Sequence, residues 1–213
     1  MTNIRMDKLC YKLYKNTGQN MKKNRYILFI YTVIGFSLIM LGYGCKNSQK
    51  ETGFSPIFKT APKDINTTTE TNVTSFLHVL RAVVPGMVER KRGHIINLGS
   101  IAGLYPMASS VYGGSKGAVH LINQNLRLEL SGTGVRATEI CPGRVETEFF
   151  DVAFSDNPEK KKEMTSGLTL LTKEDIADAI MFAINAPWRM NVSLIEITPT
   201  EQTPGGSKIE RAK

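Results

Sequence analysis

Three residues in the middle of the chain have the types and spacing needed for proton transfer: Ser100, Tyr112 and Lys116. Tyr112 and Lys116 are four residues apart, which places them on one face of a helix. A free tyrosine has a pKa of about 10, and a nearby ammonium group favours the phenolate and lowers that pKa. Tyr112 can then act as general acid or base on an alcohol or carbonyl, while Ser100 holds the substrate oxygen by a hydrogen bond.

The sequence around these residues predicts how they are positioned. Alone, a Tyr-x-x-x-Lys pattern more often marks a core tyrosine beside a solvated lysine. Here a short apolar run before Ser100 predicts a buried strand over 94–98. After Tyr112, apolar residues recur at helical spacing and predict a helix over 111–131, with Gly132 just past its end. A serine thus follows a strand and a tyrosine opens a helix, at the edge where α/β sheets bind ligands.

Further elements extend this alternation of strands and helices. The pattern predicts helices over 72–90 and 173–185 and strands over 135–140 and 192–197. Pro85 should bend or break the first of these helices, and Gly93 should end it. Thr172 and Asp175 have the spacing of a capping box at the start of the last helix. Residues 46–71 are polar and turn-rich and predict a linker. The alternation predicts a parallel α/β sheet.

The composition argues against binding to nucleic acid or metal. The net charge is +8, but residues 1–50 carry nine Lys or Arg and one acidic residue, whereas residues 51–213 carry eighteen of each sign. The folded body therefore lacks the basic patch that nucleic acid requires. Its three histidines are scattered and show no metal-ligand spacing. The three cysteines of the whole chain give no disulfide framework, which fits a reducing compartment.

The N-terminal segment, residues 1–52, has a separate character. No charged residue occurs from Tyr26 to Cys45, and Lys22, Lys23 and Arg25 precede this apolar run. The length of this apolar run lies between that of the apolar region of a signal peptide and that of a short membrane span. The basic flank would stay on the cytoplasmic side. A buried core helix is the alternative. We therefore expect an apolar N-terminal helix, with membrane association through residues 26–45 left open.

Residues 53–213 resemble the short-chain dehydrogenase/reductase family. Ser100, Tyr112 and Lys116 resemble its catalytic residues, and Asn72 resembles the fourth, which holds a water on the proton path. The run from Cys141 to Thr147 resembles the segment that covers the nicotinamide. This resemblance implies cofactor contacts from the active-site pair and from that run: Tyr112, Lys116, Pro142, Gly143, Val145 and Thr147.

Two further stretches, 85–97 and 192–199, are similar to the branch of NADP-dependent 3-hydroxy acid (serine or allo-threonine) dehydrogenases. The resemblance implies NADP as cofactor, with NAD as the alternative, and a small hydroxy acid or alcohol as substrate. It also implies a cytoplasmic homo-oligomer. Residues 148–171 should form a lid over the site. Arg144 would either pair with a substrate carboxylate or be an ordinary surface arginine.

One family feature is missing. A dinucleotide fold needs a Gly-rich turn after its first strand to bind the pyrophosphate, and no such turn precedes Asn72. The expected fold is therefore the C-terminal part of a Rossmann-like, doubly wound parallel sheet that lacks the first strands and leaves one edge bare. Two functions remain open: an NAD(P)-dependent oxidoreductase with Tyr112 as acid/base, or a truncated, inactive membrane-tethered interaction protein or mis-assembled gene product.

Overall fold

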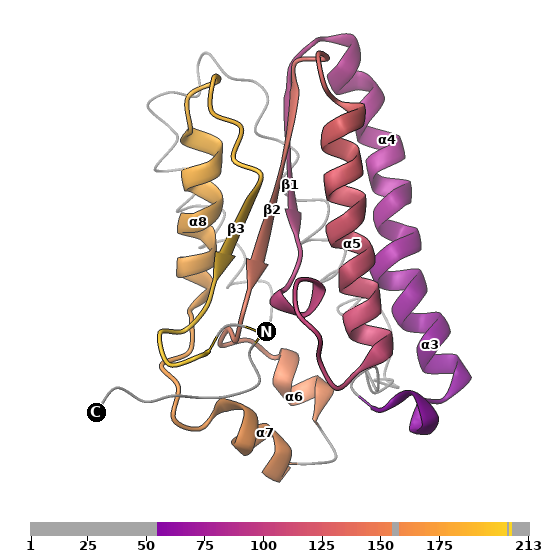
Figure 1. Ribbon diagram of the computed structural model, residues 1–213, viewed down its shortest axis with the longest axis vertical. Helices are drawn as coiled ribbons and strands as arrows, with labels where there is room; N and C mark the ends of the chain where they lie inside the picture. Colours follow the sequence, from indigo (N-terminus) through magenta and orange to yellow (C-terminus); the bar gives the residue numbers. More distant parts are fainter. Residues whose placement is uncertain (1–54, 155–157, 204, 206–213) are drawn as a thin grey trace, which may run out of the picture.

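The computed structural model describes residues 55–154, 158–203 and 205, which form an α/β fold (Figure 1). Its sheet has three parallel strands in the order β1 (Gly93–Leu98), β2 (Val135–Pro142) and β3 (Leu194–Ile197). The register pairs Leu98 with Ile140 and Ile140 with Ile195, so the carboxyl ends of the strands meet at one edge. All three predicted strands are confirmed, with ends that differ by two residues or fewer.

Helices cover both faces of this sheet. α4 (Ser75–Glu89) and α5 (Ser110–Glu129) lie on one face, and α8 (Lys173–Asn185) lies on the other (Figure 1). Apolar side chains of α4 and α5 pack with alternate residues of β1 and β2 in one core cluster: Phe76, Leu80, Met87, Ile95, Val119, Leu126, Leu130, Val135 and Ala137. A second cluster, around Ile140, Ile176 and Ile180, joins α8 to the opposite face. Nearly every residue of β2 is buried, so side chains on both faces of the sheet need covering helices, which gives the doubly wound arrangement.

The first helical segment begins earlier than predicted. α3 (Pro62–Thr69), a π-helical turn (Glu70–Thr74) and α4 follow one another without a break, so the prediction of a linker is wrong for residues 62–71. Pro62 occupies the first helical position, where its missing N–H is not needed. α4 also continues through Pro85, which is exposed and so places its ring outside the packed face.

The turn that ends α4 also differs from the prediction. The residue with positive φ is Lys91, at 53°, and Gly93 is already the first residue of β1. Gly93 is needed for packing instead, because a Cβ there would lie 2.6 Å from the sulfur of Met87. Close approach requires a second glycine in the neighbouring turn, since a Cβ on Gly134 would lie 2.3 Å from the carbonyl oxygen of Lys91.

The predicted lid segment contains two short helices, α6 (Phe149–Ala153) and α7 (Pro158–Thr165), at the carboxyl end of the sheet (Figure 1). Lys161 of α7 forms an ion pair with Asp151 of α6. The remaining elements are two 3₁₀ turns, Ile57–Lys59 and Ile101–Gly103. The predictions for residues 1–52, including the apolar run 26–45, lie outside the described residues. Within the part of the chain that the structure describes, no helix is long and apolar enough to span a bilayer.

Candidate active site

Ser100 lies where the chain leaves β1, in a 3₁₀ turn that packs directly on α5. Ser100 caps this turn, and its Oγ accepts a hydrogen bond from the Ala102 N–H at 3.1 Å. The turn approaches α5 closely because Gly103 has no side chain: a Cβ there would lie 2.5 Å from the carbonyl oxygen of Lys116. The serine turn therefore rests on the same part of α5 that carries Tyr112 and Lys116.

Tyr112 lies in the first turn of α5, and the start of that helix is fixed by Ser109. The buried Ser109 side chain accepts a hydrogen bond from the Tyr112 N–H at 3.2 Å, as an N-cap residue does. Lys116 follows one turn later on the same face. Ser109 was not singled out in the sequence, although a serine directly before the helical pattern is a recognisable cap signal.

Asn72 comes to this helix from a distant part of the sequence. It lies in the π-helical turn between α3 and α4, and its side-chain N–H donates to Ser115 Oγ at 3.0 Å. The Ser115 hydroxyl in turn donates to the backbone carbonyl of Tyr112 at 2.8 Å. Single π-helical turns inside α-helices often occur at functional sites. The structure thus joins Asn72 to the turn of α5 between Tyr112 and Lys116.

The segment after β2 is held against the sheet edge by a residue that sequence reasoning missed. Gly143 N–H donates to the carbonyl of Ile197 at 2.8 Å, and Arg144 N–H donates to Gln202 Oε1 at 3.0 Å. Gln202 is buried, and a Cβ on Gly143 would lie 2.6 Å from its Oε1. Pro142 is the last residue of β2, so the segment leaves the sheet beside the serine turn.

Beyond Gly143 the chain runs on toward the lid helices. Val145 forms a parallel bridge with Leu171, and Thr147 Oγ1 accepts a hydrogen bond from the Phe149 N–H at 3.3 Å. The Phe149 ring lies 5.9 Å from the Tyr112 ring, centroid to centroid, and is tilted by 45°. The lid segment therefore contacts the candidate acid/base directly, a contact that periodicity alone does not reveal.

Arg144 is not a surface residue. Its side chain is 8% exposed, and its Nη2 lies 4.0 Å from the sulfur of Met164 on α7. Burial lowers the pKa of Arg144, although an arginine stays charged in proteins. The surface-arginine alternative is therefore wrong, and a cation lies between the sheet edge and α7.

A shallow groove of about 360 Å³ lies beside the first turns of α5. It is lined by the 102–107 loop and the first turns of α5, including Gly113 and Gly114. Neither Ser100, Tyr112 nor Lys116 lines this groove. The side-chain chemistry on α5, rather than the groove, therefore marks the candidate site.

Comparisons with known proteins show similarity over most of the chain. The family model for short chain dehydrogenases matches residues 44–158. The NADP-dependent 3-hydroxy acid dehydrogenase YdfG of Salmonella typhi is 41% identical over 162 residues, which cover 75% of this chain and 65% of that protein. Serine 3-dehydrogenase of Rhizobium radiobacter is 36% identical over 160 residues, 75% of this chain and 64% of the relative. The chain thus spans about 65% of the length of these curated relatives.

Solved structures give the same picture. The closed form of serine dehydrogenase complexed with NADP⁺ has a TM-score of 0.67 at 38% identity, covering 75% of this chain and 65% of that one. Serine dehydrogenase from Escherichia coli has a TM-score of 0.55 at 36% identity, covering 68% of this chain and 57% of that one.

Proposed function

Since the chain belongs to the short-chain dehydrogenase family, we propose that residues 72–147 carry the catalytic centre of an NADP-dependent oxidoreductase that interconverts a small 3-hydroxy acid and its carbonyl product. The observation that carries this proposal is the convergence on α5. The serine turn and the Asn72 amide both meet the stretch of helix that holds Tyr112 and Lys116. Relatives named as 3-hydroxy acid and serine dehydrogenases support the substrate class.

In this proposal each residue has a defined chemical task. During oxidation, Ser100 donates a hydrogen bond to the substrate oxygen, and the Tyr112 phenolate accepts the hydroxyl proton. The Lys116 ammonium, one turn away, favours that phenolate. Asn72 holds a water through which the proton leaves. NADP⁺, when bound, would accept the hydride from the substrate carbon that becomes the carbonyl carbon. In the reverse direction NADPH would donate it.

The residues present fit the nicotinamide end of the cofactor. β1 and β2 end side by side, with Leu98 opposite Ile140, and ligands of α/β sheets bind at such carboxyl edges. Tyr112, Lys116 and the segment Pro142, Gly143, Val145 and Thr147 would hold this end. The pyrophosphate end has no counterpart in the sequence before Asn72, where a Gly-rich turn is absent. The name of an NADP-dependent relative supports NADP rather than NAD.

Arg144 is the proposed partner of the substrate carboxylate. A buried guanidinium favours a paired anion, because its charge is costly to remove from water, and arginine binds carboxylates through two parallel hydrogen bonds. Its place next to Gly143 and α7 supports contact with a substrate beneath the lid. Arg144→Leu should therefore raise KM for a 3-hydroxy acid far more than for an uncharged secondary alcohol.

The test uses a chimera in which the first part of the Escherichia coli relative, 39% identical to this chain, replaces the residues before 53. Purified chimera with NADP⁺ and serine or another 3-hydroxy acid should produce NADPH, followed by absorbance. The intact relative is the control. A chimera that binds NADPH but turns over no hydroxy acid or alcohol would favour the alternative, an inactive interaction protein.

The chain by itself should bind NADPH weakly. A micromolar cofactor corresponds to about −8 kcal/mol, and each missing charge-assisted hydrogen bond at the pyrophosphate removes roughly 1.5–3 kcal/mol. Calorimetric titration of the full chain with NADPH should show no saturable binding in the low micromolar range. Tight binding would mean that residues 1–71 or a partner subunit supply the missing contacts.

A cytoplasmic location suits an enzyme that uses the cytosolic NADPH pool, whereas the apolar run 26–45 suits a membrane. Fractionation of cells with and without residues 1–45 separates these alternatives. A homo-oligomer is the expected assembly, and light scattering on the purified chain measures it.

A further inference from the structure

A cluster of metal-binding side chains lies between α5 and β2, outside the residues proposed for catalysis. His120 comes from α5, and Glu139 and Cys141 occupy alternate positions of β2, so both point to the α5 face. The imidazole nitrogen, a carboxylate oxygen and the thiol sulfur all lie within 4.8 Å of one another. Glu139 and Cys141 are both 0% exposed.

The hydrogen bonds around this cluster satisfy only part of the Glu139 carboxylate. His120 Nδ1 lies 2.7 Å from Glu139 Oε2, and Gln124 Nε2 lies 2.6 Å from His120 Nε2. The other carboxylate oxygen, Glu139 Oε1, is buried and has no hydrogen-bond partner among the described residues. The Cys141 thiol lies beside Glu139, and a thiol is only a weak donor. A buried carboxylate oxygen left in this way is unfavourable unless a cation or donor approaches it.

The main chain directly after β1 packs against the Glu139 and Cys141 side chains of the cluster. A Cβ on Gly99 would lie 2.1 Å from Glu139 Oε1 and 3.0 Å from Cys141 Sγ. The backbone N–H of Ser100 is directed at the Cys141 sulfur. Any other residue at position 99 would therefore push against the carboxylate, and the cluster lies directly beneath the serine turn.

We propose that His120, Glu139 and Cys141 bind one Zn²⁺ ion between α5 and β2. Imidazole nitrogen, carboxylate oxygen and thiolate sulfur are the ligands that zinc prefers, at about 2.0–2.3 Å, and a thiolate selects zinc over magnesium or calcium. Three protein ligands leave a fourth position for water. The ion with one carboxylate and one thiolate forms a neutral unit, which suits a buried position.

The surroundings supply the outer contacts that such a site needs. The Gln124 amide can present its oxygen to His120 Nε2–H, which leaves Nδ1 free to bind the ion. The Ser100 N–H remains a donor to the metal-bound sulfur. Binding forms a Zn–S bond in place of the S–H bond, and the thiol proton passes to water. His120, which is partly exposed, offers the entry side.

Cobalt provides the direct test because Co²⁺ takes zinc sites and is coloured. Metal-free, reduced full-length chain is titrated with Co²⁺ while its absorption spectrum is recorded. We expect one Co²⁺ per chain, with a thiolate-to-cobalt charge-transfer band and visible bands of four-coordinate cobalt. One equivalent of Zn²⁺ should displace the Co²⁺ and abolish the charge-transfer band and the visible bands. A titration without a charge-transfer band would overturn the proposal and leave an ordinary buried His–Glu pair.

Variants then assign the ligands. Cys141→Ser should remove the charge-transfer band, and His120→Asn should weaken Co²⁺ binding roughly tenfold or more, since even outer contacts of metal ligands change affinity by that factor. The matched controls are His78→Asn, an exposed histidine on α4, and the double variant Cys10→Ser/Cys45→Ser. Both controls should keep the band. A band that survives in Cys141→Ser, or disappears in the cysteine controls, contradicts the assignment.

Discussion

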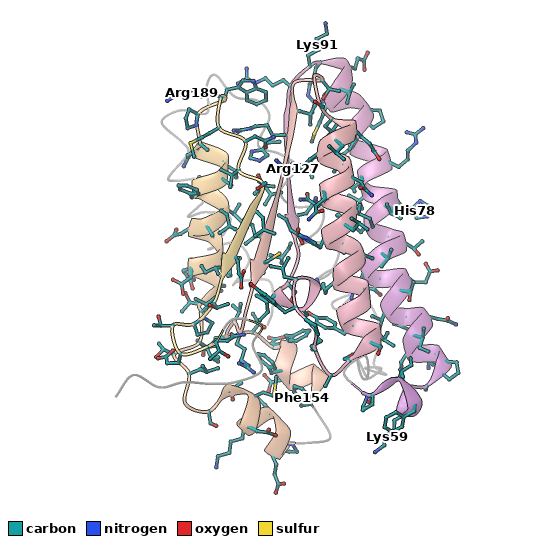
Figure 2. All side chains as sticks on the ribbon, viewed as in Figure 1. Lys59, His78, Lys91, Arg127, Phe154 and Arg189 are labelled. Carbon is teal, nitrogen blue, oxygen red and sulfur yellow. The ribbon has the colours of Figure 1, made fainter. Side chains whose placement is uncertain are left out.

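The two faces of the sheet carry their buried polar groups at opposite ends of the strands. On the α5 face, Asn97 and Glu139 lie opposite each other near the carboxyl ends, and they bond to Asn123 and His120 of the helix. On the α8 face, His94, Arg136 and Thr138 gather nearer the amino ends. In Figure 2, Lys91 and Arg189 mark the amino end, and Phe154 lies at the other.

We interpret the α5 face as the one that carries the proposed chemistry and the α8 face as a supporting face. The carboxyl end of the α5 face holds the serine turn, the start of α5 and the proposed zinc ligands. The network on the α8 face instead anchors the chain after α8: Arg136 Nη1 donates to the carbonyl of Met190 at 2.7 Å, and its guanidinium stacks on Trp188 at 4.8 Å. We therefore expect changes on the α5 face to alter chemistry and changes on the α8 face to alter stability alone.

The largest expected effect is the loss of the Tyr112 hydroxyl. In the active chimera, Tyr112→Phe should lower kcat by roughly 10²–10⁴-fold, because no neighbouring group replaces a positioned general acid or base. Tyr105→Phe is the matched control, since its hydroxyl donates to Glu196 of β3 at 3.0 Å and has no part in the proposed chemistry. Steady-state kinetics on both variants provide the measurement. A Tyr112→Phe variant with most of its rate intact would disprove the assignment of the acid/base.

The sequence alone was sufficient to predict where a residue lies when its position depends on local structure. Ser100, Tyr112 and Lys116 lie where a strand end and a helix start put them, and strand and helix periodicity are local signals. Asn72 was found through the family resemblance, but its π-helical turn was not, because α3 is polar and its packing against α5 is a tertiary effect. Propensity alone does not detect such a helix.

Sequence patterns also could not predict contacts between segments that lie far apart in the chain. Gln202 reaches Arg144 across 58 residues of sequence, and no periodicity links the two. The pair Glu139 and Cys141 was visible in principle, since alternate residues of a strand share a face. Their partner His120 lies on another element, so the cluster becomes evident only when α5 packs on β2.

The second expected effect tests the supporting face. Ile180 is buried between α8 and β2, and Ile180→Ala should lower the free energy of unfolding by roughly 2–5 kcal/mol. Phe182→Ala on the exposed side of the same helix is the control and should change stability by about 0.5 kcal/mol or less. Urea unfolding measures both. If Ile180→Ala also lowered kcat in the chimera at a temperature where it stays folded, the separation of the two faces would fail.

The third expected effect is a pH dependence of the free energy of unfolding, caused by the titration of His94. Desolvation first, then the charge of Arg136, lowers the pKa of His94 from 6.5 to about 4. Arg136 Nη2 donates to His94 Nδ1 at 3.2 Å, so Nε2–H donates to Thr138 Oγ1 at 2.8 Å. Between about pH 6.5 and 4 the unfolded chain binds a proton that the folded chain does not. Stability should therefore fall as the pH falls through this window, by about 3 kcal/mol at most.

Urea unfolding between pH 4 and 7 tests this dependence. His94→Gln should be less stable than the parent at pH 7 but should lose less stability on acidification, because it has no proton to gain. His78→Gln, exposed on α4, should keep the parent's slope. Equal slopes for the parent and His94→Gln would show that the His94 network is not the titrating group.

The smallest effect lies at the start of α8. Thr172 Oγ1 accepts a hydrogen bond from the Asp175 N–H at 3.3 Å, and the Asp175 carboxylate accepts from the Thr172 N–H at 2.7 Å. The predicted capping box is thus confirmed. The Thr172 backbone N–H, then its hydroxyl, lowers the pKa of Asp175, so this contribution to stability is present at neutral pH and is lost in acid.

Removing that cap gives the finest test of the two-face comparison. Thr172→Ala should lower the free energy of unfolding by about 1 kcal/mol, whereas Thr172→Ser keeps a capping hydroxyl and should change it much less. Thermal unfolding of the chain measures both variants. Because α8 covers the face away from Tyr112, kcat of the chimera should be the same with either residue. A parallel loss of kcat would mean that the fold transmits strain from α8 through β2 to the site, and the two faces would then act as one unit.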